Sequence, residues 1–240
     1  MDSILKSALN DLLEVFTGRR LTKNIDFLAE NRNALIERYS VDTIIDVGAN
    51  KGQWAISLVK NFPSVNIHSF EPLPTIFKSL ELIARDYKNW NVYNLGVGSR
   101  SDVARINVAS NSGLSSSFLK STNHSVVHPT IYFEKNDAEI EILPLDNFMG
   151  FGSRNFLKID TGGYENAVLD GISGKINLIS LIEIESSFTP MYEGESTHHR
   201  LISRLEDLGF VPILFGNVHR DVSGRVWQLD TLLISKELLE

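Results

Sequence analysis

The hydrophobic residues of this chain change period several times, from short continuous runs to helical spacing and back. Short segments at residues 43–47, 66–70 and 91–95 are expected to form strands. The segments between them, residues 53–62 and 74–87, carry apolar side chains three and four positions apart and predict helices. Strands that alternate with helices in this way indicate a parallel, doubly wound sheet with right-handed crossovers.

The same alternation returns in the second half of the chain, after an irregular middle. Residues 104–109 and 139–143 are expected to form short alternating strands, with a polar stretch from Asn111 to Pro129 between them. That stretch is long for a structureless loop, so we expect it to be functional or mobile. Beyond it the pattern predicts strands at residues 156–160, 178–185, 211–215 and 228–234, and helices at residues 164–170 and 198–208.

The two ends of the chain add further expectations. The last two predicted strands leave little room for a helix between them, so we expect them to be antiparallel neighbours. The N-terminal segment predicts one helix with an apolar stripe from Ile4 to Phe16, and a second helix over residues 24–39. We expect these helices to pack on the edge of the sheet, with a dimer contact or a lid as the alternative. Ser196 is the expected cap of the helix that follows it.

The chain is expected to form one domain, because no internal repeat, low-complexity segment or linker interrupts it. Residues 1–40 would be a helical extension and residues 41–240 the core. The expected fold class is α/β, a Rossmann-like, mostly parallel sheet with an antiparallel C-terminal strand and two added N-terminal helices.

Composition narrows the classes of protein to which this chain can belong. Its 240 residues are 42% hydrophobic and 22% charged, as in an ordinary globular protein. The absence of cysteine excludes disulfides, thiolate metal sites and cysteine nucleophiles, and fits a reducing compartment. The net charge of -7 argues against nucleic acid as a partner. No run approaches the roughly 20 apolar residues of a membrane span, and the N-terminus lacks a signal peptide, so we expect a cytoplasmic location.

A glycine-containing turn follows the first predicted strand, where an open α/β sheet places its ligand. The dinucleotide fingerprint requires glycines at its first, third and sixth positions, which here hold Gly48, Asn50 and Gln53. A side chain at Asn50 occupies the space that a pyrophosphate needs, and no Gly-Lys-Ser/Thr sequence follows to make a P-loop. The turn therefore suits a nucleoside without phosphates.

Two acidic residues strengthen this interpretation. Asp46 lies at the end of the first predicted strand, and Glu71 closes the second strand, where an acid often binds ribose hydroxyls. Carboxylates also favour a cationic ligand and repel an extra phosphate. S-adenosylmethionine combines a ribose, a sulfonium cation and no phosphate. The alternative is an ordinary turn, followed by an acid that caps the next helix.

Several stretches together resemble the FkbM-type methyltransferases. They are "IIDVGANKGQWAISLVKNFPSVNIHSFEPLPTIFKSL", "SGLSSSF", "FLKIDTGGYENAVLDGI" and "IEIESSFTPMYEGE", in that order. The resemblance covers the chain from about Thr43 to its C-terminus. It implies a class I methyltransferase fold and S-adenosylmethionine as the methyl donor. It also implies O-methylation, with acceptor hydroxyls that are often on sugars or polyketides.

The resemblance also implies roles for particular residues, which divide by the part of the cofactor that they would bind. One departure from the family pattern is Gly163, which stands where a polar side chain is common. If that side chain contacts the acceptor in relatives, this chain lacks the contact. The implied residues are Asp46, Gly48, Asn50 and Gly52 for the methionine part, Glu71 for the ribose, and Gly96 and Val97 for the adenine.

Acidic residues near the ends of later strands are the candidates for catalysis. Methyl transfer gains most from a positioned acceptor oxygen, and an alcohol must also lose a proton, so a general base helps. Asp160 is the first choice because its strand end lies closest to the expected methyl group, and Glu185 is the second. Glu183 shares a strand face with Glu185, so one of the two is expected to be structural. Together these acids provide an alternative Mg²⁺ site, which we do not favour.

The acceptor contacts are the least constrained part of the site. Candidate contacts are Glu165, in the turn after Asp160, and the polar residues of the long central stretch. Histidines also have pKa values suited to proton transfer, although most histidines are ordinary surface residues. The candidates from these two groups are Ser115, Ser116, His124 and His128 in the central stretch, and His198 and His199 at the start of a helix.

The expected function is therefore transfer of a methyl group from S-adenosylmethionine to a hydroxyl of a sugar, glycan or related small molecule. An NAD-dependent oxidoreductase and a nucleoside-binding scaffold without turnover are the alternatives. A homodimer through the N-terminal helices is also an expectation. The sequence does not identify the acceptor, because acceptor pockets are built from loops that carry little sequence pattern.

Overall fold

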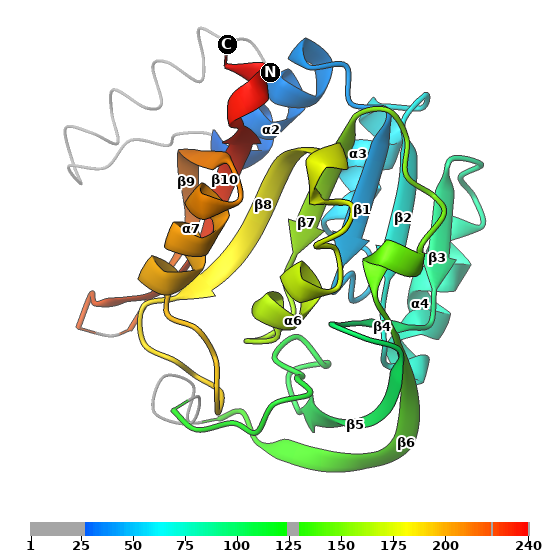
Figure 1. The fold of residues 1–240 in the computed structure, drawn as a ribbon. Coiled ribbons are helices and arrows are strands. Elements are labelled where there is room, and N and C mark those ends of the chain that lie inside the picture. The colour runs from blue at the N-terminus through cyan, green and yellow to red at the C-terminus, as the bar shows by residue number, and fades with distance from the viewer. Residues whose placement is uncertain (1–26, 124–129, 222, 240) are drawn as a thin grey trace, which may run out of the picture.

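A computed structural model describes residues 27–123, 130–221 and 223–239. Its largest element is a seven-stranded sheet in the order β3-β2-β1-β7-β8-β10-β9 (Figure 1). Strand β10 runs antiparallel to its neighbours β8 and β9, and the other pairs are parallel. The strands are β1 (Thr43–Val47), β2 (Asn66–Phe70), β3 (Trp90–Tyr93), β7 (Asn155–Ile159), β8 (Ile179–Ser187), β9 (Phe210–Arg220) and β10 (Val226–Ser235).

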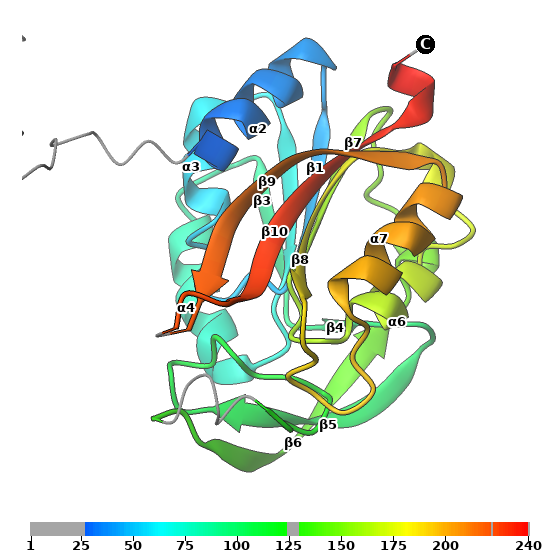
Figure 2. The same cartoon turned by 90° about the vertical axis from the view of Figure 1, so that its left-hand side faces the viewer.

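Helices cover both faces of this sheet, as the doubly wound prediction requires. Helices α2, α3 and α4 lie on one face, and α6 and α7 lie on the other (Figure 2). Each face has its own buried core, and neighbouring β1 residues point to opposite cores: Ile44 to the α3 side and Ile45 to the α7 side. The helices are α2 (Phe27–Arg38), α3 (Ala55–Asn61), α4 (Pro74–Ala84), α6 (Glu165–Asp170) and α7 (His198–Asp207), with 3₁₀ turns η1 (Leu145–Asn147), η2 (Ile176–Leu178) and η3 (Lys236–Leu238).

A second, smaller sheet lies below the carboxyl ends of the central strands (Figure 1). Its order is β4-β6-β5, from β4 (Gly96–Val97), β5 (Asp102–Ala109) and β6 (Phe133–Leu143). Strands at 104–109 and 139–143 were expected, but not that they pair with each other in a separate sheet. Strand β4 has only two residues, which is too short to give a periodic signal. This sheet closes the edge where the ligand of an open α/β sheet binds.

The expected parallel sheet with an antiparallel C-terminal strand is confirmed, and the differences from the prediction are local. The helix expected at 24–39 is α2, and the helix expected around Ile4 to Phe16 lies outside the described residues. The prediction of Ser196 as a helix cap was wrong. Thr197 precedes α7, while the Ser196 hydroxyl accepts a hydrogen bond from the Asn166 side chain.

Helix α2 packs against β9, the last strand at one edge of the large sheet. Leu28 of this helix is 1% exposed and lies over Gly216 of β9, where an added Cβ would approach the leucine side chain to 2.7 Å. The glycine thus lets the helix come close to the sheet. Across residues 27–123, 130–221 and 223–239, no helix has the length and apolar character needed to cross a membrane.

Candidate active site

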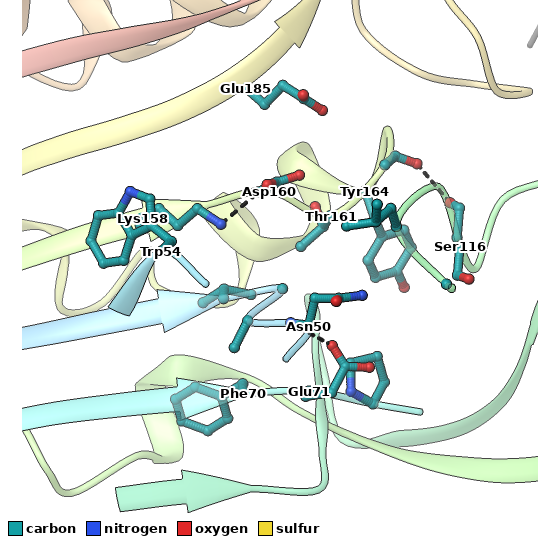
Figure 3. Close-up of a pocket in the computed structure, with 18 of the residues that line it drawn as sticks. Asn50, Trp54, Phe70, Glu71, Ser116, Lys158, Asp160, Thr161, Tyr164 and Glu185 are labelled. Carbon is teal, nitrogen blue, oxygen red and sulfur yellow. Dashed lines mark hydrogen bonds and ion pairs between the residues drawn. The ribbon is translucent and has the colours of Figure 1, made fainter. Parts of the chain in front are cut away.

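A cavity of about 590 Å³ lies at the carboxyl ends of β1 and β7. These two strands are neighbours although β2 follows β1 in the chain, so the strand order reverses between them. Such a reversal is where ligands bind in open α/β sheets. Figure 3 shows the cavity with Asn50 and Glu71 toward one end and Asp160 and Glu185 toward the other.

The turn after β1 approaches the loop after β7 more closely than a side chain would allow. Gly48 has a positive φ of 83°, and a Cβ built on it would lie 1.7 Å from the carbonyl oxygen of Asp160. The neighbouring Asp160 N–H donates to the carbonyl of Val47. The glycine is therefore required by backbone contact between two loops, and this contact forms the floor of the cavity.

Glu71 is held in the cavity wall by two backbone donors. One carboxylate oxygen accepts from the N–H of Asn50 and the other from the N–H of Leu73, each at 2.8 Å. The residue is 4% exposed, and burial raises its pKa to about 7. An ionised carboxylate has about four acceptor positions, so two remain for ligand hydroxyls. Asn50 adopts the left-handed conformation, with φ of 49°, which places its N–H toward Glu71.

Two of the residues assigned to the cofactor lie beneath the cavity rather than in its wall. Asp46 is fully buried, accepts from the Ser69 hydroxyl at 2.9 Å and lies 3.6 Å from the Lys158 ammonium. Gly52 faces the core, where a Cβ would lie 2.6 Å from the Trp90 ring. Both can shape the turn without touching a ligand. The assigned residues that do line the cavity are Gly48, Asn50, Glu71, Gly96 and Val97.

Lys158 is a buried cation that the sequence analysis did not single out. Its ammonium donates to Asp160 at 3.1 Å and lies 5.7 Å from the centre of the Trp54 ring. Burial works against its charge, but the carboxylates of Asp160 and Asp46 outweigh burial and hold the pKa of Lys158 above its usual value. Asp160 lines the cavity as expected, with one of its oxygens already engaged by this lysine.

The two acids of β8 have separate environments. Glu183 forms a buried ion pair with Arg32 of α2, and the Trp54 indole also donates to it at 2.9 Å. Glu185 lines the cavity, and its carboxylate accepts from the Gln228 amide at 3.3 Å. Burial, together with the charges of Asp160, Asp230 and Glu165, raises the pKa of Glu185 well above its usual value.

Glu165 organises the loop after β7 instead of facing the cavity. Its Oε1 accepts from the Thr161 N–H at 3.2 Å, from the Thr161 hydroxyl at 3.0 Å and from the Gly163 N–H at 3.0 Å. Gly163 has φ of 89°, and a side chain there would point at Tyr192 and Glu195, which lie outside the cavity wall. In this backbone a side chain at position 163 would not line the cavity.

The remaining candidates are dispersed. Ser116 lines the cavity, whereas the Ser115 carbonyl accepts from the Tyr192 hydroxyl at 2.8 Å. His198 is hydrogen-bonded to Ser186 at 2.8 Å, away from the cavity wall, and His199 is exposed. His124 and His128 lie outside the described residues. Within those residues, no group of three or more His, Asp or Glu side chains is arranged to hold a metal ion.

Sequence reasoning missed one whole wall of the cavity. This wall comes from α2 and from the β9–β10 hairpin, whose residues meet the central strands only in the folded sheet. The sequence does contain a signal for one of these residues. Asp230 is an acid inside an apolar strand, which is unusual unless the acid has a function. The missed wall residues are Ala29, Arg32, Asn217, Val218, His219 and Asp230.

The buried carboxyl groups predict that the ligand-free protein loses stability as pH rises. Burial raises the pKa values of Glu71 and Glu165 to about 7 from 4.5, so the folded state binds more protons than the unfolded state between these values. We expect urea unfolding to show a loss on the order of 1 kcal/mol per pH unit for each carboxyl between about pH 5 and about pH 7, with little further change at higher pH.

Glu165→Gln provides a matched test of this dependence. All three donors bind one oxygen of Glu165, which glutamine retains, so the loop should keep its hydrogen bonds while the pH slope becomes shallower. The exposed Glu81→Gln is the control and should leave the slope unchanged. A slope that is equally steep in Glu165→Gln would contradict the assignment.

A comparison with models of protein families finds one match. Residues 46–212 match the family described as "Methyltransferase FkbM domain". The chain belongs to this family. The match contains the Gly48 turn, Glu71 and the loop after β7, and it ends before the β9–β10 hairpin is complete. No curated protein matches the chain. The six residues of the missed wall, Ala29, Arg32, Asn217, Val218, His219 and Asp230, lie outside the matched segment.

Solved structures with a similar fold include several methyltransferases. Magnesium protoporphyrin IX methyltransferase (ChlM) from Synechocystis with bound SAM is 10% identical, with 96% of each chain covered and a TM-score of 0.48. TehB from Haemophilus influenzae is 9% identical, with 95% of this chain and 67% of that chain covered and a TM-score of 0.48. Precorrin-6y C5,15-methyltransferase from Geobacter metallireducens is 12% identical, with 92% and 95% covered and a TM-score of 0.45.

Proposed function

We propose that this FkbM-family protein transfers a methyl group from S-adenosylmethionine to a hydroxyl group of a sugar or related small molecule. The observation that carries the cofactor part is Glu71. Its carboxylate is fixed by the N–H groups of Asn50 and Leu73 and keeps acceptor positions on the cavity side. A rigid carboxylate of this kind suits the two adjacent hydroxyls of a ribose.

The rest of the cavity fits the remaining parts of the same cofactor. Apolar side chains between β2 and the small sheet suit an adenine ring. Acids at the opposite end favour a sulfonium cation over a phosphate, because they attract positive charge. Asn50, in the third fingerprint position, narrows the space for a pyrophosphate. The apolar residues at the adenine end are Leu73, Leu95, Val97, Ile106 and Phe118.

The acidic end of the cavity supports a hydroxyl acceptor. S-adenosylmethionine would supply a methyl group bound to a positively charged sulfur, so the protein must position an oxygen and receive its proton. Asp160 and Glu185 line this end and are within the same cavity as Glu71. Hydroxyl groups donate to carboxylates, which would orient a sugar there.

Isothermal titration calorimetry with S-adenosylhomocysteine tests the cofactor. We expect binding by the unmodified protein, and affinity reduced about 10- to 100-fold in Glu71→Gln, because an amide cannot accept from both backbone N–H groups and the ribose. Glu81→Gln on the exposed face of α4 is the control. NADH should not bind. No binding of S-adenosylhomocysteine, or binding indifferent to Glu71→Gln, would contradict the proposal.

A further inference from the structure

Two carboxyl groups face one another across neighbouring strands in the acidic end of the cavity. Asp230 of β10 is the direct antiparallel partner of Glu185 of β8. Side chains of directly opposed residues project from the same face of a sheet, with their Cβ atoms about 4.5–5.5 Å apart. Both residues line the cavity. They therefore form a carboxyl pair, which we call the Glu185–Asp230 pair.

The hydrogen bonds to this pair come from neutral amide groups and not from cations. The Gln228 amide donates to Glu185, and the Asn217 amide donates to Asp230. The nearby cations are engaged elsewhere: Lys158 bonds to Asp160, and Arg32 bonds to Glu183. No ion pair reaches either carboxyl group from the residues that the structure describes. Two buried carboxyl groups at this separation, with the nearest cation already bonded to Asp160, cannot both ionise readily.

The charges around the pair further oppose ionisation of both carboxyl groups. Burial and the charges of neighbouring acids raise the pKa of Glu185 well above its usual value, and burial with Asp160 raises the pKa of Asp230 to about 7. The groups facing the pair come from every neighbouring element. They are Lys158 from β7, Asp160 directly after β7, Glu183 with its partner Arg32, Glu165 from α6, His219 from β9, and Tyr192 from the loop after β8.

We propose that the Glu185–Asp230 pair holds one proton, releases it when a sulfonium cation enters the cavity, and regains one from the acceptor's hydroxyl group. This rests on the proposed function. It makes the pair the proton acceptor and leaves Asp160, which Lys158 already engages, as a positioning residue. Asp230 lies outside the matched family segment, so this role adds a residue to the site.

Charge and atoms balance through the step. The acceptor's oxygen gains a bond to the methyl carbon as the carbon–sulfur bond breaks, and that bond's electron pair stays on sulfur. The hydroxyl proton moves to the ionised pair, so the site loses one positive charge at sulfur and regains one on the pair. The products are the methyl ether, neutral S-adenosylhomocysteine and a pair that again holds one proton. The pair can then release this proton when the next sulfonium cation binds.

Proton release on binding tests the pair without an acceptor. Calorimetric titrations near neutral pH, in buffers of different ionisation enthalpy, count the protons released by S-adenosylmethionine and by S-adenosylhomocysteine. We expect the sulfonium compound to release more protons, and Glu185→Gln and Asp230→Asn each to abolish the difference. Glu81→Gln on the exposed face of α4 is the control, because Glu81 does not line the cavity, and it should retain the difference.

A carboxyl-carbon NMR titration of the unmodified protein gives an independent readout if a variant does not fold. One carboxyl group of the pair should titrate near neutral pH. In Asp230→Asn, the titration of Glu185 should shift to lower pH by about one unit because its partner's charge is gone. Equal proton release by the two compounds, or Glu185 titration unchanged by Asp230→Asn, would overturn the pair. Absence of all S-adenosylhomocysteine binding would instead overturn the proposed function.

Discussion

Gly48→Ala is expected to destabilise the fold by roughly 3–5 kcal/mol and to abolish binding of S-adenosylhomocysteine. The new Cβ would lie 1.7 Å from the Asp160 carbonyl oxygen, and the φ of 83° disfavours any side chain. The clashing atom belongs to the backbone, so no rotamer change relieves it. Either β1 or β7 must move, and the cavity floor between them would open.

Gly194→Ala separates the clash from the conformational penalty. Gly194 has a similar φ of 81°, but no atom lies within 4 Å of an added Cβ. We expect this variant to cost only about 1–2 kcal/mol, the penalty for a left-handed alanine. Urea unfolding of both variants would measure the difference. Equal losses would show that the approach of Gly48 to Asp160 is not a constraint.

Arg32→Met is expected to destabilise the protein by about 3–5 kcal/mol, because it leaves the Glu183 charge buried and unpaired. The guanidinium donates to both carboxylate oxygens, at 2.5 and 2.7 Å, and the two side chains are 4% and 2% exposed. Arg32 also stacks 4.9 Å from the centre of the Trp54 ring. Loss of the arginine should therefore loosen α2 and the cavity wall together.

A double variant distinguishes the buried charge from lost packing. Arg32→Met combined with Glu183→Leu removes both charges, so it should be more stable than Arg32→Met alone. The exposed pair of Arg85 and Glu81 on α4 is the control, and Arg85→Met should cost less than about 0.5 kcal/mol. Simple additivity of the two buried substitutions in thermal or urea unfolding would rule out this coupling.

The central strands were predictable because their signal is local. The strands expected at 43–47 and 66–70 coincide with β1 and β2, since β1 is buried throughout and Ile67, Ser69 and Phe70 of β2 are buried. Strand β4 was not predictable, because its two residues are strands only through pairing with Ile142 and Leu143 of β6. The information that defines it lies more than 40 residues away in the chain.

The site shows the same division between local and distant signals. The sequence singled out Gly48 as a turn residue, but the reason for the glycine is the Asp160 carbonyl, which comes from another strand. Asp230 faces Glu185 because β10 and β8 pair in that register, although no turn joins these two strands. Register of that kind depends on the whole sheet, and the neighbouring β9–β10 pairing contains irregularities that no periodic pattern reveals.

Helix α2 has a consequence for how this chain can be divided. It carries Arg32, the counter-charge of Glu183, and it supplies Ala29 to the cavity wall although it lies outside the family segment. A chain without residues 27–38 would leave the Glu183 charge without its counter-charge and would open one side of the cavity. Helix α2 is thus needed both for the buried charge balance of β8 and for the shape of the cavity, although it lies outside the family segment.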